Sequence, residues 1–193
     1  MTLTGELSGD PGDLPRIYSE SIGPFRDILI ELTEVQNSGH EVLTVYSRHA
    51  DAVAKTLSAH CDASEGSRPT NPADIRKYMT QEMTSLWDFR DFLVDDLNFY
   101  DAEIFRAVIS DCTVQVRTVI YSELNSIRRN VQALADSIRA AWDDLSDRES
   151  SSKQRVKSRA EALQCLRDVA QGWLTLSEEL ASAAGLWRRE GSA

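Results

Sequence analysis

Two aspartate-rich runs are the residues of this 193-residue chain whose types and spacing are best suited to chemistry. The first run is Asp95-Asp96-Leu97-Asn98-Phe99-Tyr100-Asp101, and the second is Asp143-Asp144-Leu145-Ser146-Asp147. Asp143 and Asp147 are four residues apart, so on a helix their carboxylates would project from one face. Paired carboxylates of this kind bind Mg²⁺, which in turn holds phosphate groups. The runs are therefore compatible with magnesium-dependent chemistry on a diphosphate.

The form of these runs resembles the aspartate-rich motifs of helical prenyl-transferring enzymes. The resemblance implies Mg²⁺ ions held between facing helices and a prenyl diphosphate as substrate. In this chain only 48 residues separate the starts of the two runs, and no clear arginine or lysine clamp for a diphosphate follows the first. The other interpretation is that both runs are exposed acidic helix ends. We favour it, and keep the prenyl-diphosphate enzyme as an alternative.

Other residue types that carry chemistry do not form recognisable sites. The sequence has no phosphate-binding loop, nucleophile elbow or dinucleotide glycine fingerprint. His40 and His49 fall on opposite faces of a helix, and His60 lies three turns beyond His49, so no single metal ion would join them. Cys61, Cys112 and Cys165 are far apart and lack metal-ligand spacing, which favours structural thiols in a reducing compartment. We therefore predict a protein that is not an enzyme and holds no metal or cofactor.

Charge and hydropathy narrow the class of protein further. The chain has 31 acidic and 21 basic residues, a net charge of −10, which argues against nucleic-acid binding. No apolar run approaches 18 residues, so no transmembrane helix is expected. The first residues lack the basic and apolar regions of a secretory signal. These features predict a cytoplasmic protein.

Apolar residues recur at alternating three- and four-residue steps, which predicts an all-α protein. We expect four long helices, at about 25–61, 72–99, 102–147 and 152–188, in one elongated antiparallel bundle over 15–189. Residues 1–14 have the composition of a disordered segment, and 190–193 form a tail. Asn37-Ser38-Gly39 is a site where the first helix kinks or breaks, and continuity of the second and third helices is left open. Because 102–147 is much longer than 72–99, its distal half is expected to pair with 152–188 as a projecting coiled-coil-like two-helix arm.

An aromatic segment within 86–105 is the candidate partner-binding surface. Its apolar arc is too broad for one neighbouring helix to bury, so one side is predicted to stay open as an aromatic hot spot with an acidic rim. Such a rim would select a basic amphipathic helix. The alternative is that two neighbouring helices cover the whole segment. The candidate residues are Trp87, Phe89 and Phe92, with Asp88, Asp91, Asp95 and Asp96 as the rim.

A basic stretch follows at 148–167, where six basic residues accompany only two acidic ones. It falls at the expected turn between the last two helices. The functional interpretation is contact with an anionic membrane surface or an acidic partner helix, and the alternative is a solvated turn. The candidate contact residues are Arg148, Lys153, Arg155, Lys157 and Arg159.

Together these features predict a non-enzymatic protein-protein interaction or scaffold module. It would act through helical bundle or coiled-coil pairing, as a homo- or hetero-oligomer. A membrane-associated module similar to the curved BAR-type bundles is the runner-up, although a net charge of −10 opposes binding to anionic lipid.

Overall fold

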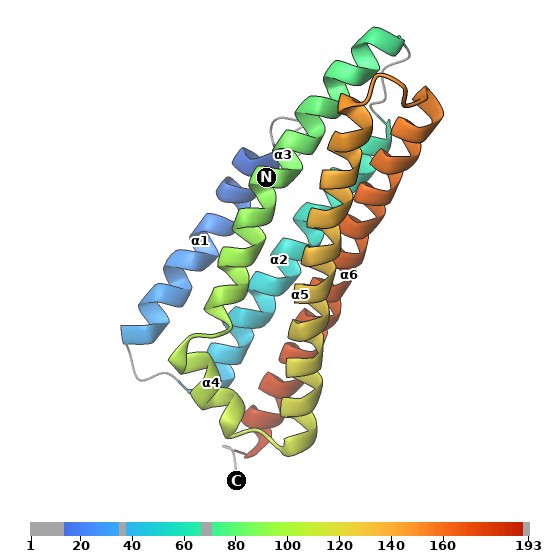
Figure 1. The fold of residues 1–193 in the computed structure, drawn as a ribbon. Coiled ribbons are helices and arrows are strands. Elements are labelled where there is room, and N and C mark those ends of the chain that lie inside the picture. Colours follow the sequence, from blue (N-terminus) through green and yellow to red (C-terminus); the bar gives the residue numbers. More distant parts are fainter. Residues whose placement is uncertain (1–13, 35–37, 67–70, 191–193) are drawn as a thin grey trace.

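The computed structural model describes residues 14–34, 38–66 and 71–190, and these ranges contain helices and no strand. The all-α bundle is therefore confirmed (Figure 1). The predicted disordered segment and tail lie almost wholly outside the described residues, although Leu14 already belongs to the first helix. None of the described helices has the length and apolar character needed to cross a membrane. The six described helices are α1 (Leu14–Glu34), α2 (Gly39–Gly66), α3 (Pro72–Phe99), α4 (Glu103–Ser110), α5 (Val114–Ser146) and α6 (Ser152–Glu190).

The long helices run side by side along one direction, so the molecule is elongated (Figure 1). Helix α6 packs most extensively against α2 and α5, while α3 lies against α5, and α1 covers α2 and α3. The predicted projecting arm is wrong, because α2 and α3 accompany α5 and α6 up to the turn that joins them. Near that turn, Arg159 of α6 donates a hydrogen bond to the carbonyl of Ser64 in α2, at 2.9 Å.

The helix expected over 25–61 is two helices, and the break lies where the sequence carries a capping signal. The Ser38 hydroxyl accepts a hydrogen bond from the backbone N–H of Glu41 at 3.3 Å, and the Glu41 carboxylate accepts one from the N–H of Ser38 at 3.2 Å. This reciprocal arrangement is a capping box, which satisfies two backbone donors at the start of α2. The first helix also begins earlier than expected, at Leu14.

The helix expected over 102–147 is also two helices, which corrects the third predicted element. Helix α4 ends at Ser110, and the Thr113 side chain accepts a hydrogen bond from the N–H of Val116 at 3.4 Å, so α5 has a new N-cap. The short α4 turns the chain between α3 and α5. Its Phe105 packs on Tyr46 of α2, with ring centroids 4.6 Å apart.

Gly39 provides room for an aromatic ring at the start of α2. A Cβ atom at this position would lie 2.3 Å from the Trp187 ring of α6, far closer than van der Waals contact. We expect Gly39→Ala to lower the free energy of unfolding by about 1–3 kcal/mol, since the ring must move. Urea unfolding of the two proteins measures this difference.

Gly185 supplies the matched control, because a Cβ there meets nothing within 4 Å. Gly185→Ala should raise stability by about 0.5–1 kcal/mol through helix propensity alone. If the Trp187 ring is the cause of the loss, Gly39→Ala should cost less in a Trp187→Ala background. An equal cost in both backgrounds would contradict this explanation.

Candidate functional site

The aromatic segment of α3 is covered from two sides. Phe92 packs on Tyr18 of α1 with ring centroids 6.0 Å apart, while Trp87 packs on Trp142 of α5 at 5.2 Å. Phe89 is fully buried and meets Tyr18 edge-on at 4.7 Å. Phe89 is thus a core residue, which corrects its assignment to an exposed binding surface. Helices α1 and α5 pack against the two arcs, but they do not cover the whole segment, because Trp87 and Phe92 are only partly buried and Val94 is exposed.

Three of the four predicted rim aspartates lie at the surface. Asp88, Asp91 and Asp95 are exposed along the outer face of α3, whereas Asp96 is fully buried. Successive helix residues point about 100° apart, so Asp96 turns from the outer face toward the interior. Its assignment to the rim was wrong, and the other three remain candidates.

Trp87 is half-buried, and two guanidinium groups lie near its ring. The Arg90 guanidinium carbon is 4.2 Å from the centre of the Trp87 ring, and that of Arg139 in α5 is 5.1 Å away. Both distances are within the range of cation–π interaction. Arginines from α3 and α5 therefore meet over an aromatic pair at the seam between these helices.

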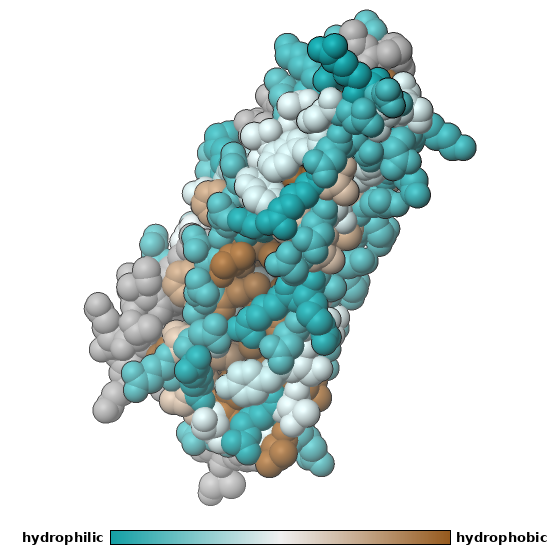
Figure 2. Space-filling view, in the orientation of Figure 1, coloured by the Kyte–Doolittle hydropathy of each residue, from teal (hydrophilic) through white to brown (hydrophobic). Residues whose placement is uncertain are grey.

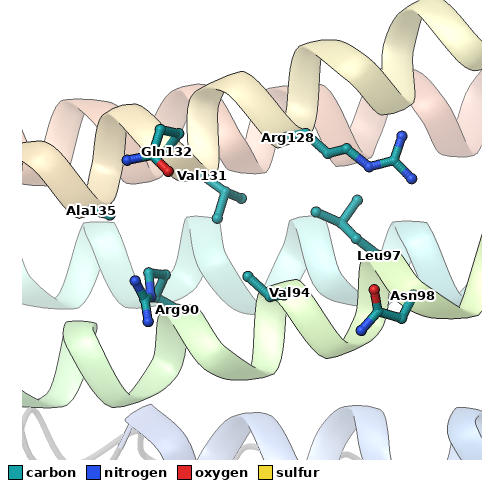
Figure 3. A pocket seen from close by; sticks show the side chains of 8 residues that line it. All are labelled: Arg90, Val94, Leu97, Asn98, Arg128, Val131, Gln132 and Ala135. Carbon is teal, nitrogen blue, oxygen red and sulfur yellow. The ribbon is translucent and has the colours of Figure 1, made fainter.

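The same seam opens into a groove of about 230 Å³. Val94, Leu97 and Val131 point toward one another in it, and Arg90 and Arg128 lie at its two ends (Figure 3). Val94 is 42% exposed and lies at the edge of this groove, beside side chains that are almost fully buried. Figure 2 shows hydrophobic surface part-way along this face, with hydrophilic side chains around it. The full lining is Arg90, Val94, Leu97, Asn98, Arg128, Val131, Gln132 and Ala135.

Ion pairs orient the arginines at both ends of the groove. Arg128 donates to both carboxylate oxygens of Asp101, at 3.1 and 3.2 Å, and to the Asn125 side-chain oxygen at 3.2 Å. Arg90 is paired with Asp91 at 2.7 Å. Sequence reasoning missed this groove. The available signal was Val94, an apolar residue off the main seam of its helix.

The basic turn is largely engaged within the chain. Arg155 donates to the carbonyl of Asp144 at 3.1 Å and to that of Asp147 at 2.8 Å, which satisfies acceptors at the end of α5. Arg159 is directed inward, and Lys157 pairs with Glu161 at 3.7 Å. The prediction that Arg155 and Arg159 contact an outside anion is corrected accordingly. Arg148 and Lys153 are exposed and stay predictions.

The structure does not bring the two aspartate-rich runs together. Asp101 pairs with Arg128, while Trp142, next to the second run, contacts Trp87. Fourteen residues of α5 separate Arg128 from Trp142. Asp101, at the end of the first run, therefore lies about 21 Å along the bundle from the start of the second run. Asp144 accepts hydrogen bonds from Ser158, Gln154 and Ser150, and the bond from Ser158 is the main reason that its pKa is lowered.

A buried polar cluster lies at the centre of the bundle, where α2, α3 and α6 meet. His49 and Asp96 are fully buried, with Nε2 and Oδ1 3.6 Å apart, and His49 Nδ1 is 3.0 Å from the Tyr100 hydroxyl. Tyr100 in turn donates to the carbonyl of Tyr46 at 3.1 Å. The Trp173 ring packs edge-on against His49, with centroids 5.8 Å apart. Burial raises the pKa of Asp96 to about 8, so its carboxyl is mostly protonated at neutral pH.

A second buried cluster ties the same three helices together near the turn between α5 and α6. The Arg159 guanidinium makes two bonds to the Glu82 carboxylate, at 2.6 and 3.1 Å, besides its bond to Ser64. It also lies 5.7 Å from the centre of the Tyr78 ring. Burial, with the charge of Arg159, lowers the pKa of His60 to about 4, so this imidazole is neutral at pH 7.

The remaining candidates for reactivity are the cysteines, which form no disulfide with one another. Cys61 is fully buried, and burial raises its pKa to about 12. A thiol in that state is a poor nucleophile, because only the thiolate attacks. Cys61 is therefore a buried thiol, as predicted, and its structural role stays a prediction.

Within the described part of the chain, no three histidine, cysteine, aspartate or glutamate side chains are placed to hold a metal ion. No protein-family model, curated protein or solved structure matches the chain. The arrangement best suited to recognising another molecule is the groove between α3 and α5.

Proposed function

We propose that the protein is a non-enzymatic interaction module and that the groove between α3 and α5 receives a helix of a protein partner. The observation that carries this proposal is the exposure of Val94 beside an apolar floor. Leu97, Val131 and Ala135 form that floor and are nearly inaccessible to water. A partially exposed apolar strip between two helices is where an amphipathic helix commonly docks.

The size of the groove favours a helix over a small molecule. Small-molecule sites usually enclose about 300–1,000 Å³. This groove is smaller, at about 230 Å³, and open to solvent along the seam. It has room for one or two aliphatic side chains, which is what a docking helix inserts. Arg90, Arg128, Asn98 and Gln132 supply polar contacts around the apolar floor, as in the rim of a protein interface.

A photo-crosslinking amino acid at position 94 tests the proposal directly. Expressed in cells of the source organism, the variant should form a covalent adduct with a protein upon irradiation, and mass spectrometry should place the link in a helical segment. Position 164 is the matched control, because Gln164 is exposed on α6. Equal adducts at both positions, or none at position 94, would rule out docking in the groove.

A further inference from the structure

The two helices that border the groove carry opposite charge on their outward edges. Over residues 86–101, beside the groove, four exposed aspartates accompany one arginine, Arg90. Over residues 128–142 of α5, three arginines accompany one aspartate, Asp136, which pairs with Arg139 at 3.2 Å. We name these edges the acidic rim (Asp88, Asp91, Asp95 and Asp101) and the basic rim (Arg128, Arg129 and Arg139).

The two rims extend over the same length of the bundle. Trp87 contacts Trp142 at one end, and Asp101 pairs with Arg128 at the other. Since α3 and α5 are antiparallel, each step toward the C-terminus of α3 is matched by one step toward the N-terminus of α5. The Trp87–Trp142 and Asp101–Arg128 contacts agree on which residues of α3 and α5 lie side by side. By this register, Val94 and Ala135 lie at the same height along the bundle.

A surface with one acidic edge and one basic edge is complementary to a copy of itself. Two copies facing each other around a two-fold axis parallel to the helices place α3 of each over α5 of the other. The acidic rim of one copy then faces the basic rim of its partner on both sides. A perpendicular axis would set acidic rim against acidic rim, which is repulsive.

The apolar residues fit the same arrangement. In the parallel-axis pairing, Val94 of one copy comes level with Ala135 of the other, a small residue in the groove floor. The larger Val131 lies one turn away along α5 and does not block it. The Val94 side chain of one copy can therefore pack against Ala135 of the other, where the groove floor has no bulky side chain.

We propose that the partner helix is α3 of a second copy of this chain, paired through the α3–α5 face around a two-fold axis parallel to the bundle. This inference rests on the proposed function, since it names the occupant of the same groove. The paired face is about 20 Å long. It is smaller than standard protein interfaces, so the dimer is weak and concentration-dependent.

Two charge-reversed variants test the pairing. The first carries Asp88→Lys, Asp91→Lys and Asp95→Lys, so that both of its rims are basic. The second carries Arg129→Glu and Arg139→Glu, so that both of its rims are acidic. In sedimentation equilibrium from about 1 µM to about 1 mM, each variant alone should dimerise at least about tenfold more weakly than the unchanged chain. An equimolar mixture should restore a 1:1 dimer, because unlike rims then face each other on both sides.

A third variant controls for net charge, and circular dichroism melting verifies that all variants are folded. Reversing three exposed acids of α6 (Glu161→Lys, Asp168→Lys and Glu178→Lys) changes net charge as much as the first variant does, and should leave dimerisation intact. An unchanged chain that stays monomeric throughout, or a mixture that does not associate, would overturn self-pairing. If a monomeric chain still crosslinks through position 94 to a different protein, self-pairing is wrong while the proposed function stands. If neither occurs, both are wrong.

Discussion

Replacing Arg159 with methionine is expected to lower the free energy of unfolding by about 3–5 kcal/mol. The Glu82 side chain is 0% exposed, and the guanidinium of Arg159 is its bidentate partner. Without that partner a carboxylate remains in the interior with its charge uncompensated. Glu82→Met should lower the free energy of unfolding by less than Arg159→Met does. The reason is that Arg159 is 12% exposed and keeps its bond to Ser64 and its contact with Tyr78. Urea denaturation measures both values.

The double variant Glu82→Met/Arg159→Met identifies the cause of the loss. It should be more stable than Arg159→Met alone, since no charge is then left buried. Lys55→Met provides a control, because Lys55 and Asp51 form an exposed ion pair whose loss should change stability by about 1 kcal/mol or less. In the Arg159→Met protein the pKa of His60 should rise, which NMR titration follows. A double variant less stable than Arg159→Met would contradict the buried-charge explanation.

The parts of the fold that the sequence predicts well are those with strong local signals. Helix α3 begins at Pro72, where Asn71-Pro72 marks a helix start, and α6 follows the serine-rich turn after Asp147. The break before α5 has no such signal, because Phe105, Val108, Cys112 and Val116 keep their helical spacing across it. Periodicity cannot detect a break that leaves the apolar residues in step, and the cap at Thr113 is a single side chain.

The candidate site was harder to predict, because it depends on which helix covers which face. The sequence shows that α3 has a broad apolar arc, and it identifies Trp87, Phe92 and the aspartates around them. It does not show that α1 takes one side of the arc and α5 the other. That assignment buries Phe89 and leaves Val94 at the edge of a groove, while Asp96 is buried beside His49 of α2. Packing between helices distant in the chain decides these positions, and a single sequence contains no direct record of it.

The buried polar cluster around His49 and Asp96 gives the second large effect on the free energy of unfolding, and this effect depends on pH. The carboxyl of Asp96 has an ordinary pKa of 3.8, and burial in the folded protein raises it to about 8. Between these two values the unfolded chain releases the proton and the folded protein retains it, so rising pH favours unfolding. The contribution of Asp96 to stability is therefore full below about pH 4, is lost as the pH rises to about 8, and changes no further above that.

Asparagine at position 96 has the shape of the protonated carboxyl and does not ionise. Asp96→Asn should therefore not lose stability through this group as the pH rises from about 4 to about 8. At pH 4 the variant and the unchanged protein should have nearly equal stability, and by pH 8 the variant should be more stable by about 1–4 kcal/mol. Urea midpoints across this range give the difference between the two proteins. Asp88→Asn, at an exposed position, should show a difference of less than about 0.5 kcal/mol at every pH. If Asp96→Asn is instead the less stable protein at pH 8, Asp96 is held as a charged partner of His49, and the cluster is an ion pair rather than a neutral hydrogen-bonded group.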